Sequence, residues 1–243
     1  MKLLVVLTVY KRNNIEDQLK HINNQTIKPD YLVVFQNENH VDISNLKKNY
    51  NFIHIKSDYN TKFFGRFASC FTFPVDICMV LDDDIMPGNN CLKNYMEQCI
   101  KLNSIIGGNG RIAMNNKNSP HPPVALFDTG IRPDHILVDF VGHLWCFKKE
   151  WLHYMFYIKP FTYDTGEDMH LCFSCKILGN IDSYIGKQLK FDDQCDITYN
   201  KLAGGIYATC RTVTGLNGPN GLRSNVEKYF IKNYKLQLIK SNK

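Results

Sequence analysis

The sequence has no uninterrupted apolar stretch of about 18 residues, the length that a membrane-spanning helix needs. Its first apolar run, 3–7, is interrupted at Thr8 and Tyr10 and is soon followed by Lys11 and Arg12. This pattern favours a buried strand over a signal peptide. We therefore expect no transmembrane segment and a location in the cytoplasm.

The sequence also has no strong charge imbalance and no cysteine framework. Lys and Arg total 29 against 23 Asp and Glu, a net charge of +6, which suits a phosphate-bearing partner but is too small for a protein that coats nucleic acid. The nine cysteines are scattered and odd in number, which favours reduced thiols in a cytosol-like compartment. With 44% apolar and 21% charged residues, disordered and collagen-like classes are excluded.

Apolar strands alternate with amphipathic helices through the first half of the chain. Continuous apolar strands that alternate with helices indicate a parallel sheet covered on both faces, and 243 residues fit a single α/β domain. The predicted strands are 3–9, 31–35, 52–55, 76–81, 105–106 and 136–147, and the predicted helices are 15–22, 65–73, 91–102, 149–157, 167–178 and 226–239. Polar or glycine-rich loops are predicted at 115–123 and 209–223.

Three consecutive aspartates, Asp82, Asp83 and Asp84, follow the apolar strand 76–81. Open α/β sheets bind ligands at the carboxyl ends of their strands. Adjacent carboxylates repel one another, and a hard divalent cation such as Mg²⁺ or Mn²⁺ offsets that repulsion. An exposed acidic turn or a helix cap is the alternative, but the position after a buried strand favours a metal site.

A second acidic pair, Glu167 and Asp168, begins the predicted helix 167–178. Carboxylates are stabilised at a helix N-terminus, so capping alone is enough to explain this pair. A catalytic role is the other interpretation that the residues leave open.

The segment 60–67, Asn-Thr-Lys-Phe-Phe-Gly-Arg-Phe, followed by Val-Leu-Asp-Asp-Asp at 80–84, resembles the nucleotide-sugar half of GT-A glycosyltransferases. The resemblance covers about residues 3–90 and is closest to the GT2 and exostosin-like GT64 families and to glycosyltransferases encoded by large DNA viruses. It implies a GT-A fold, with a nucleotide-binding half at about 1–106 and an acceptor-binding half and tail at 107–243. The implied activity is metal-dependent transfer of a sugar from a nucleoside diphosphate, with UDP favoured, to a glycan or other hydroxyl acceptor.

The resemblance also implies roles for individual residues. Asp84 and Asp82 would hold Mn²⁺ or Mg²⁺. Arg211 and Arg223 bracket a glycine-rich loop that either closes over the diphosphate or is an ordinary surface connection. A solvated helix position is the alternative for Arg66, and a packed aromatic position is the alternative for Tyr10. The predicted donor-binding residues are Thr8, Tyr10, Arg12, Gln36, Asn60, Lys62, Arg66, Asp82, Asp83 and Arg211.

The segments 166–171 and 141–147 resemble, respectively, the downstream Glu-Asp segment of GT-A enzymes and the stretch that crosses their active site. Asp168, with Glu167, is therefore a candidate general base if the enzyme inverts, and an orienting carboxylate if it retains. His143 and Trp145 are candidate acceptor contacts, with structural roles as the alternatives. No histidine follows His170, whereas many GT-A enzymes use a late histidine as a metal ligand.

Two other functions remain open. A sugar nucleotidyltransferase also pairs aspartates with metal and phosphates, but residues 8–12 lack the glycine- and lysine-rich signature typical of that class. A carbohydrate-binding protein with a GT-A fold is the non-enzymatic alternative. The lysines of the last 16 residues favour a solvated face, and peripheral contact with an anionic membrane is the alternative.

Overall fold

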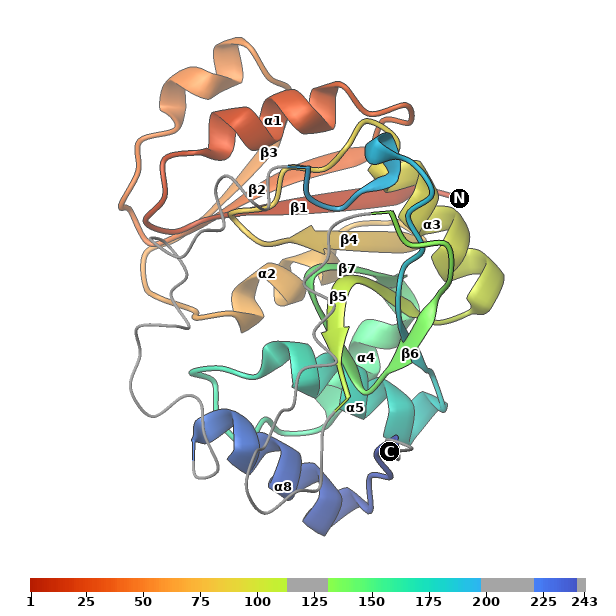
Figure 1. Ribbon diagram of the computed structural model, residues 1–243. Coiled ribbons are helices and arrows are strands. Elements are labelled where there is room, and N and C mark those ends of the chain that lie inside the picture. Colours follow the sequence, from red (N-terminus) through yellow and green to blue (C-terminus); the bar gives the residue numbers. More distant parts are fainter. Residues whose placement is uncertain (113–130, 198–220, 240–243) are drawn as a thin grey trace.

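The computed structural model describes residues 1–112, 131–197 and 221–239. Within these residues, eight strands form one sheet in the order β3-β2-β1-β4-β7-β5-β8-β6 (Figure 1). Strands β3, β2, β1 and β4 are parallel, and β7 is antiparallel to both of its neighbours, β4 and β5. The strands are β1 (Leu3–Val9), β2 (Tyr31–Asn37), β3 (Ile53–Ser57), β4 (Ile77–Leu81), β5 (Ile105–Arg111), β6 (Ile136–Val138), β7 (Phe140–Lys148) and β8 (Ser183–Ile185).

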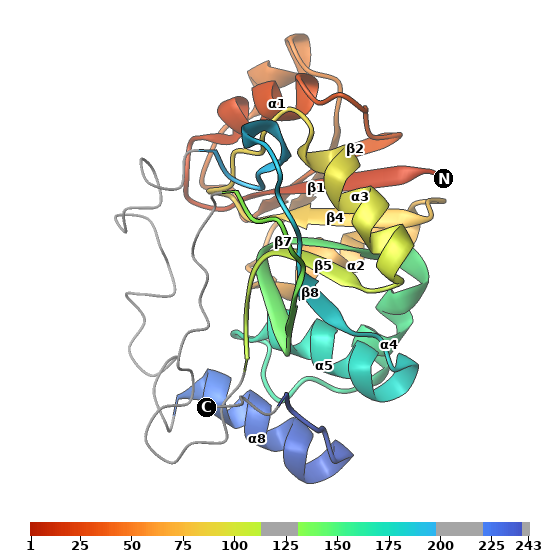
Figure 2. The ribbon, with the colours of Figure 1, turned by 45° about the vertical axis from the view of Figure 1, so that its right-hand side comes forward.

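Helices cover both faces of the sheet. α1 and α3 lie on one face, where Gln25 at the end of α1 accepts from the Leu92 amide of α3. α2, α4 and α5 lie on the other face, and α8 packs against α5 as an outer layer (Figure 2). The helices are α1 (Ile15–Asn23), α2 (Phe64–Ser69), α3 (Cys91–Leu102), α4 (Leu152–Tyr157), α5 (Glu167–Gly179) and α8 (Leu222–Tyr234), with short 3₁₀ turns at Ser44–Lys48, Cys70–Thr72, Lys149–Trp151 and Phe191–Asp193.

The central strands bring the sequence motifs to one edge of the sheet. β1 and β4 read as continuous apolar runs because helices cover both of their faces. Their register pairs Leu7 with Leu81, so the turn after β1 and the aspartates after β4 lie side by side. β2 continues this edge, since Val9 pairs with Gln36. The predicted α/β fold with a central sheet between helices is confirmed.

Among the predicted elements, three differ most from the structure. The strand predicted at 136–147 is two strands, β6 and β7. The short strand predicted at 105–106 extends through the glycine run as β5, because β7 lies so close that a Cβ on Gly107 would sit 2.2 Å from Val141 Cβ. The last helix is Leu222–Tyr234 and not 226–239, because Lys235 adopts a left-handed conformation that ends it.

In the part of the chain that the structure describes, every helix is too short or too polar to traverse a lipid bilayer. The eight cysteines there are buried and none is in a disulfide. The predicted loop 115–123 and residues 209–220 of the second loop lie outside the described residues.

The inner face of α8 carries Glu227, whose side chain is buried and whose Oε2 has no hydrogen-bond partner within the described residues. Burial, reinforced by Asp139, raises the pKa of Glu227 to about 7. The folded protein therefore binds this proton more tightly than the unfolded chain does. The resulting stabilisation is complete below the ordinary glutamate pKa and is lost as the pH rises through 7.

We predict that Glu227→Gln leaves the free energy of unfolding nearly unchanged at pH 5 and raises it by about 1–2 kcal/mol at pH 8. Thermal denaturation followed by circular dichroism at both pH values measures this change. Glu97→Gln on α3 is the control, because the Glu97 side chain is 62% exposed and its replacement should have little effect at either pH. An equal effect of Glu227→Gln at pH 5 and pH 8 would contradict the prediction.

Candidate active site

The three aspartates form a turn at the carboxyl end of β4, and each is paired with an arginine. Arg66 Nη1, from α2, donates to Asp82 Oδ1 at 2.5 Å. Arg12, from the segment after β1, contacts both Asp83 and Asp84, with its Nη1 3.0 Å from Asp84 Oδ2. Burial raises the pKa of Asp82 against the lowering effect of Arg66. When all three aspartates are ionised, the turn has three negative charges against two arginines, a balance of 2 − 3 = −1.

Two amides at the start of α1 fix the backbone of this turn. Asn14 Nδ2 donates to the carbonyl of Asp83 at 2.7 Å. Gln18 Nε2 donates to the carbonyls of Asp82 at 2.7 Å and Ile85 at 2.9 Å. No sequence pattern marks either residue, because a polar residue on an amphipathic helix ordinarily faces solvent, whereas Gln18 is fully buried.

Arg66 connects the two acidic motifs. Its Nη2 donates to Glu167 Oε1 at 2.9 Å, while its Nη1 holds Asp82. The guanidinium lies over the Trp145 ring, 4.7 Å from the centroid, and only 4% of the side chain is exposed. Burial alone would lower the pKa of Arg66, but Asp82 and Glu167 outweigh that effect and raise it. The Arg66 side chain thus joins Asp82, 16 positions along the chain, to Glu167, 101 positions along the chain.

This arrangement corrects two sequence-based assignments. Arg66 is buried and is not placed to contact a diphosphate, because its two terminal nitrogens are bound to the carboxylates of Asp82 and Glu167. Trp145 is not an acceptor contact, because its ring is 1% exposed and its indole nitrogen donates to the carbonyl of Val141. The aromatic ring packs on Phe67 and Arg66 as part of the core.

The second acidic pair occupies the first turn of α5, after Gly166. Asp168 Oδ2 forms an ion pair with Arg223, and its Oδ1 accepts from the Met169 amide at 2.8 Å. Glu167 faces Arg66 and is 5% exposed. Burial, then the neighbouring Asp168, raises the pKa of Glu167 to about 7. Capping alone does not account for these carboxylates, because each is also paired with a buried or half-buried arginine.

A polar cluster lies beside the turn, at the ends of β1 and β2. Asn60 Nδ2 donates to the Tyr10 hydroxyl at 2.9 Å, and Asn37 Nδ2 donates to Asn60 Oδ1 at 2.9 Å. Thr8 Oγ1, on β1, is buried without a hydrogen-bond partner among the described residues. The structure therefore joins Tyr10 and Asn60, with Thr8, on β1, two residues before Tyr10, and their role in donor binding stays a prediction. Asn37 completes the cluster, although the sequence analysis gave it no role.

Two other predicted donor contacts lie apart from this cluster. Gln36 is 2% exposed and donates to the carbonyl of Val41 at 2.7 Å, which favours a role in holding the chain after β2 over a contact with the donor. Lys62 is exposed, with its Nζ 3.5 Å from Asp164 Oδ1, and stays a candidate. Arg211 lies outside the described residues.

His143 remains a candidate acceptor contact. It is half-buried on β7 beside the acidic turn, and its carbonyl accepts from the Asp82 amide at 2.9 Å. It takes a left-handed backbone conformation, with φ 65°, which only a few per cent of residues other than glycine adopt. Such conformations cluster at functional sites.

Asp82 and Asp84 are the residues of the turn that could hold a divalent cation. Across the described residues no group of three or more His, Cys, Asp or Glu side chains is arranged to hold a metal, but Mg²⁺ ordinarily takes only one or two carboxylates and leaves its other positions to water and phosphates. The carboxylates of Asp82 and Asp84 are 27% and 29% exposed and sit at i and i+2. The site has five carboxylates, those of the three aspartates and of the acidic pair on α5, and three arginines, Arg12, Arg66 and Arg223. Its formal charge, with every group ionised, is 3 − 5 = −2.

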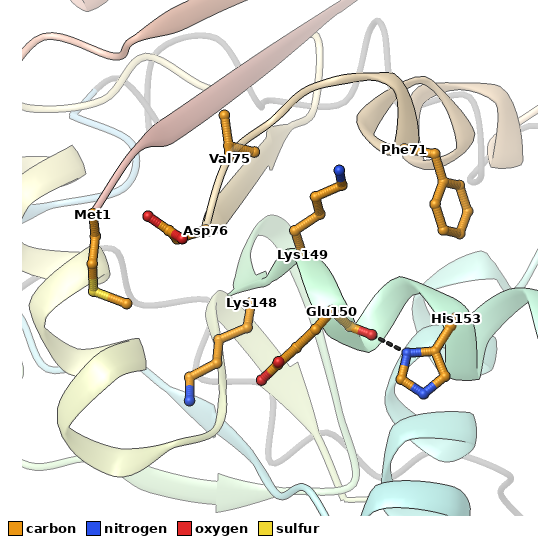
Figure 3. Close-up of a pocket in the computed structure, with 8 residues that line it drawn as sticks. All are labelled: Met1, Phe71, Val75, Asp76, Lys148, Lys149, Glu150 and His153. Atoms are coloured by element: carbon orange, nitrogen blue, oxygen red, sulfur yellow. Dashed lines mark hydrogen bonds between the residues drawn. The ribbon is translucent and has the colours of Figure 1, made fainter.

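A separate hollow of about 610 Å³ lies at the other end of the sheet, between the start of β4 and the end of β7 (Figure 3). It contains none of the predicted site residues and lies at the amino ends of β1 and β4, away from the edge where open α/β sheets bind ligands. It is lined by Met1, Phe71, Val75, Asp76, Lys148, Lys149, Glu150 and His153.

No family model and no curated protein matches the sequence. Among solved structures, S. aureus TarS 1–349 in complex with UDP matches with a TM-score of 0.52 and 12% identity, over 78% of this chain and 59% of that chain. A structure of S. aureus TarS matches at 0.49 and 15% identity, over 77% of this chain and 37% of that one. The first match shows a shared fold, and this chain spans little more than half of that neighbour's length. The resemblance to virus-encoded enzymes stays a prediction.

We predict that Arg66→Met destabilises the fold by about 3–5 kcal/mol, because it leaves the buried Glu167 carboxylate and Asp82 without their shared counter-ion. Chemical denaturation measures the loss. Lys62→Met is the matched control, since its exposed ion pair with Asp164 should contribute less than about 1 kcal/mol. Equal stability of the Arg66 and Lys62 variants would show that the buried bridge is not a structural requirement.

Proposed function

We propose that this chain is a metal-dependent glycosyltransferase that moves a sugar from a nucleoside diphosphate, with UDP favoured, to a hydroxyl of a glycan or similar acceptor. One observation carries the proposal: Arg66 joins the acidic turn after β4 to the acidic pair of α5, at the carboxyl edge of the sheet. The fold shared with a structure that has UDP bound supports this assignment.

The donor would lie along the edge formed by β1, β2 and β4. The hydroxyl of Thr8, which has no hydrogen-bond partner among the described residues, and the ring of Tyr10 suit the nucleoside. The exposed Lys62 supplies positive charge for the diphosphate, while Arg12 holds Asp83 and Asp84. Asp84 and Asp82 would hold Mn²⁺ or Mg²⁺. Bound there, the cation supplies positive charge that offsets the charge growing on the leaving diphosphate.

The acceptor would approach from the side of α5. In an inverting reaction, the acceptor oxygen bonds to the anomeric carbon, the bond from that carbon to the diphosphate breaks, and Asp168 takes the hydroxyl proton. Glu167 is less suited to this role, because its carboxylate faces Arg66 under the turn. His143 would border the acceptor. In a retaining reaction, Asp168 orients the substrates instead.

We expect calorimetry to show UDP binding that needs Mn²⁺ or Mg²⁺. Asp84→Ala should weaken that binding by about 10- to 100-fold, because it removes a charged metal ligand, while Asp192→Ala, an exposed aspartate on another turn, should not change it. GDP binding in place of UDP would redirect the search for the donor. Failure to bind either with metal present would favour the carbohydrate-binding alternative, and release of pyrophosphate would favour a nucleotidyltransferase.

Asp168→Asn should lower sugar transfer by about 10²- to 10⁴-fold and leave the dissociation constant for UDP within about twofold, because the amide cannot accept the acceptor proton. A transfer assay and calorimetry on the same preparation measure the two quantities. Asp164→Asn, in the exposed loop before α5, is the control and should transfer normally. Normal transfer by the Asp168 variant would remove it from the reaction.

A further inference from the structure

Arg223 lies in the first turn of α8, the outermost helix, yet it reaches the candidate base. Its Nη2 forms an ion pair with Asp168 Oδ2, and the two side chains are 15% and 11% exposed. The guanidinium also lies over the ring of Phe140, 5.9 Å from its centroid. A residue 55 positions further along the chain thus determines the surroundings of Asp168.

Apolar packing between α8 and α5 brings Arg223 to this position. Phe230 of α8 contacts the rings of His170 and Phe173 on α5, with centroids 5.3 Å and 5.4 Å apart. Val226 lies over Gly166, where an added Cβ would come within 3.1 Å of a Val226 methyl group. The two views agree that α8 lies beneath α5 (Figures 1 and 2). The packing of α8 on α5 therefore fixes the position of Arg223 relative to the first turn of α5.

The two contacts of Asp168 fix the orientation of its carboxylate. The Met169 amide binds Oδ1 and Arg223 binds Oδ2, and because a carboxylate has about four lone-pair sites, it can still accept from a hydroxyl. A general base has to lie within hydrogen-bond reach of the proton it takes, and a displacement of about 1 Å costs about 100-fold in rate. The Met169 amide belongs to α5 itself, whereas Arg223 belongs to α8.

We propose that Arg223 is a positioning residue for the transfer reaction: it orients Asp168 toward the acceptor hydroxyl, so that the C-terminal helix completes the active site. This inference rests on the proposed function. It differs from the expectation that Arg223 ends a loop closing over the diphosphate. That role would appear in the affinity for UDP, whereas a positioning role appears in turnover.

The test compares Arg223→Ala and Arg223→Lys with the wild type in a sugar-transfer assay and in calorimetric titration with UDP and Mn²⁺. We expect kcat of Arg223→Ala to fall by about 100-fold, with the dissociation constant for UDP within about twofold. Arg223→Lys should recover part of the loss. Millimolar guanidinium chloride should restore activity to Arg223→Ala, and sodium chloride at the same concentration should not. Lys232→Ala, exposed on the same helix, is the control and should behave as wild type.

Several results would overturn the inference. They are an unchanged kcat in Arg223→Ala, a loss of UDP affinity as large as the loss of kcat, or no recovery with guanidinium. If Arg223→Ala shows no cooperative thermal transition, Arg223→Lys decides, because it keeps the charge but lacks the guanidinium geometry. Wild-type turnover in that variant would defeat the role. A wild-type protein that transfers no sugar would defeat the proposed function as well, whereas an active wild type with an unaffected Arg223→Ala would defeat this inference alone.

Discussion

The buried guanidinium of Arg66 is the constraint on which the candidate site depends. It lies on the Trp145 ring and is bound by Asp82 on one side and Glu167 on the other. A buried charge is costly unless it is paired and hydrogen-bonded, so the end of β4 and the start of α5 must each present a carboxylate to it. The site is therefore part of the way the two halves of the domain pack together, and it is not an addition to a finished fold.

Arginines also pair with the other carboxylates of the candidate site. Arg12 binds the other two aspartates of the turn, and Arg223 binds Asp168. Each arginine comes from a different segment, one after β1, one on α2 and one on α8. Together they keep the carboxylates close to one another, yet they leave an excess of negative charge on the partly exposed side of the turn. A diphosphate would meet repulsion there without a cation, which is the physical reason to link donor binding with metal.

Much of the fold could be predicted from local patterns. The apolar runs at 3–9 and 76–81 identified β1 and β4, because strands buried on both faces need continuous apolar sequence. The boundaries failed where tertiary contacts decide them. The close approach of β7 determines how far β5 extends through its glycines, and the packing of Leu236 after the left-handed Lys235 determines where α8 ends.

The sequence by itself determined which residue types meet the carboxyl edge of the sheet: Thr8, Tyr10 and the aspartates follow directly from strand ends. It could not distinguish a ligand-facing side chain from one buried beneath the site. Arg66 and Trp145 were candidate ligand contacts and are buried beneath the site, and Gln18, which no sequence pattern marked, holds the acidic turn. Only the tertiary structure decided these roles, because burial and ion pairing depend on segments far apart in the chain. A local sequence pattern does not predict which arginine pairs with a given carboxylate.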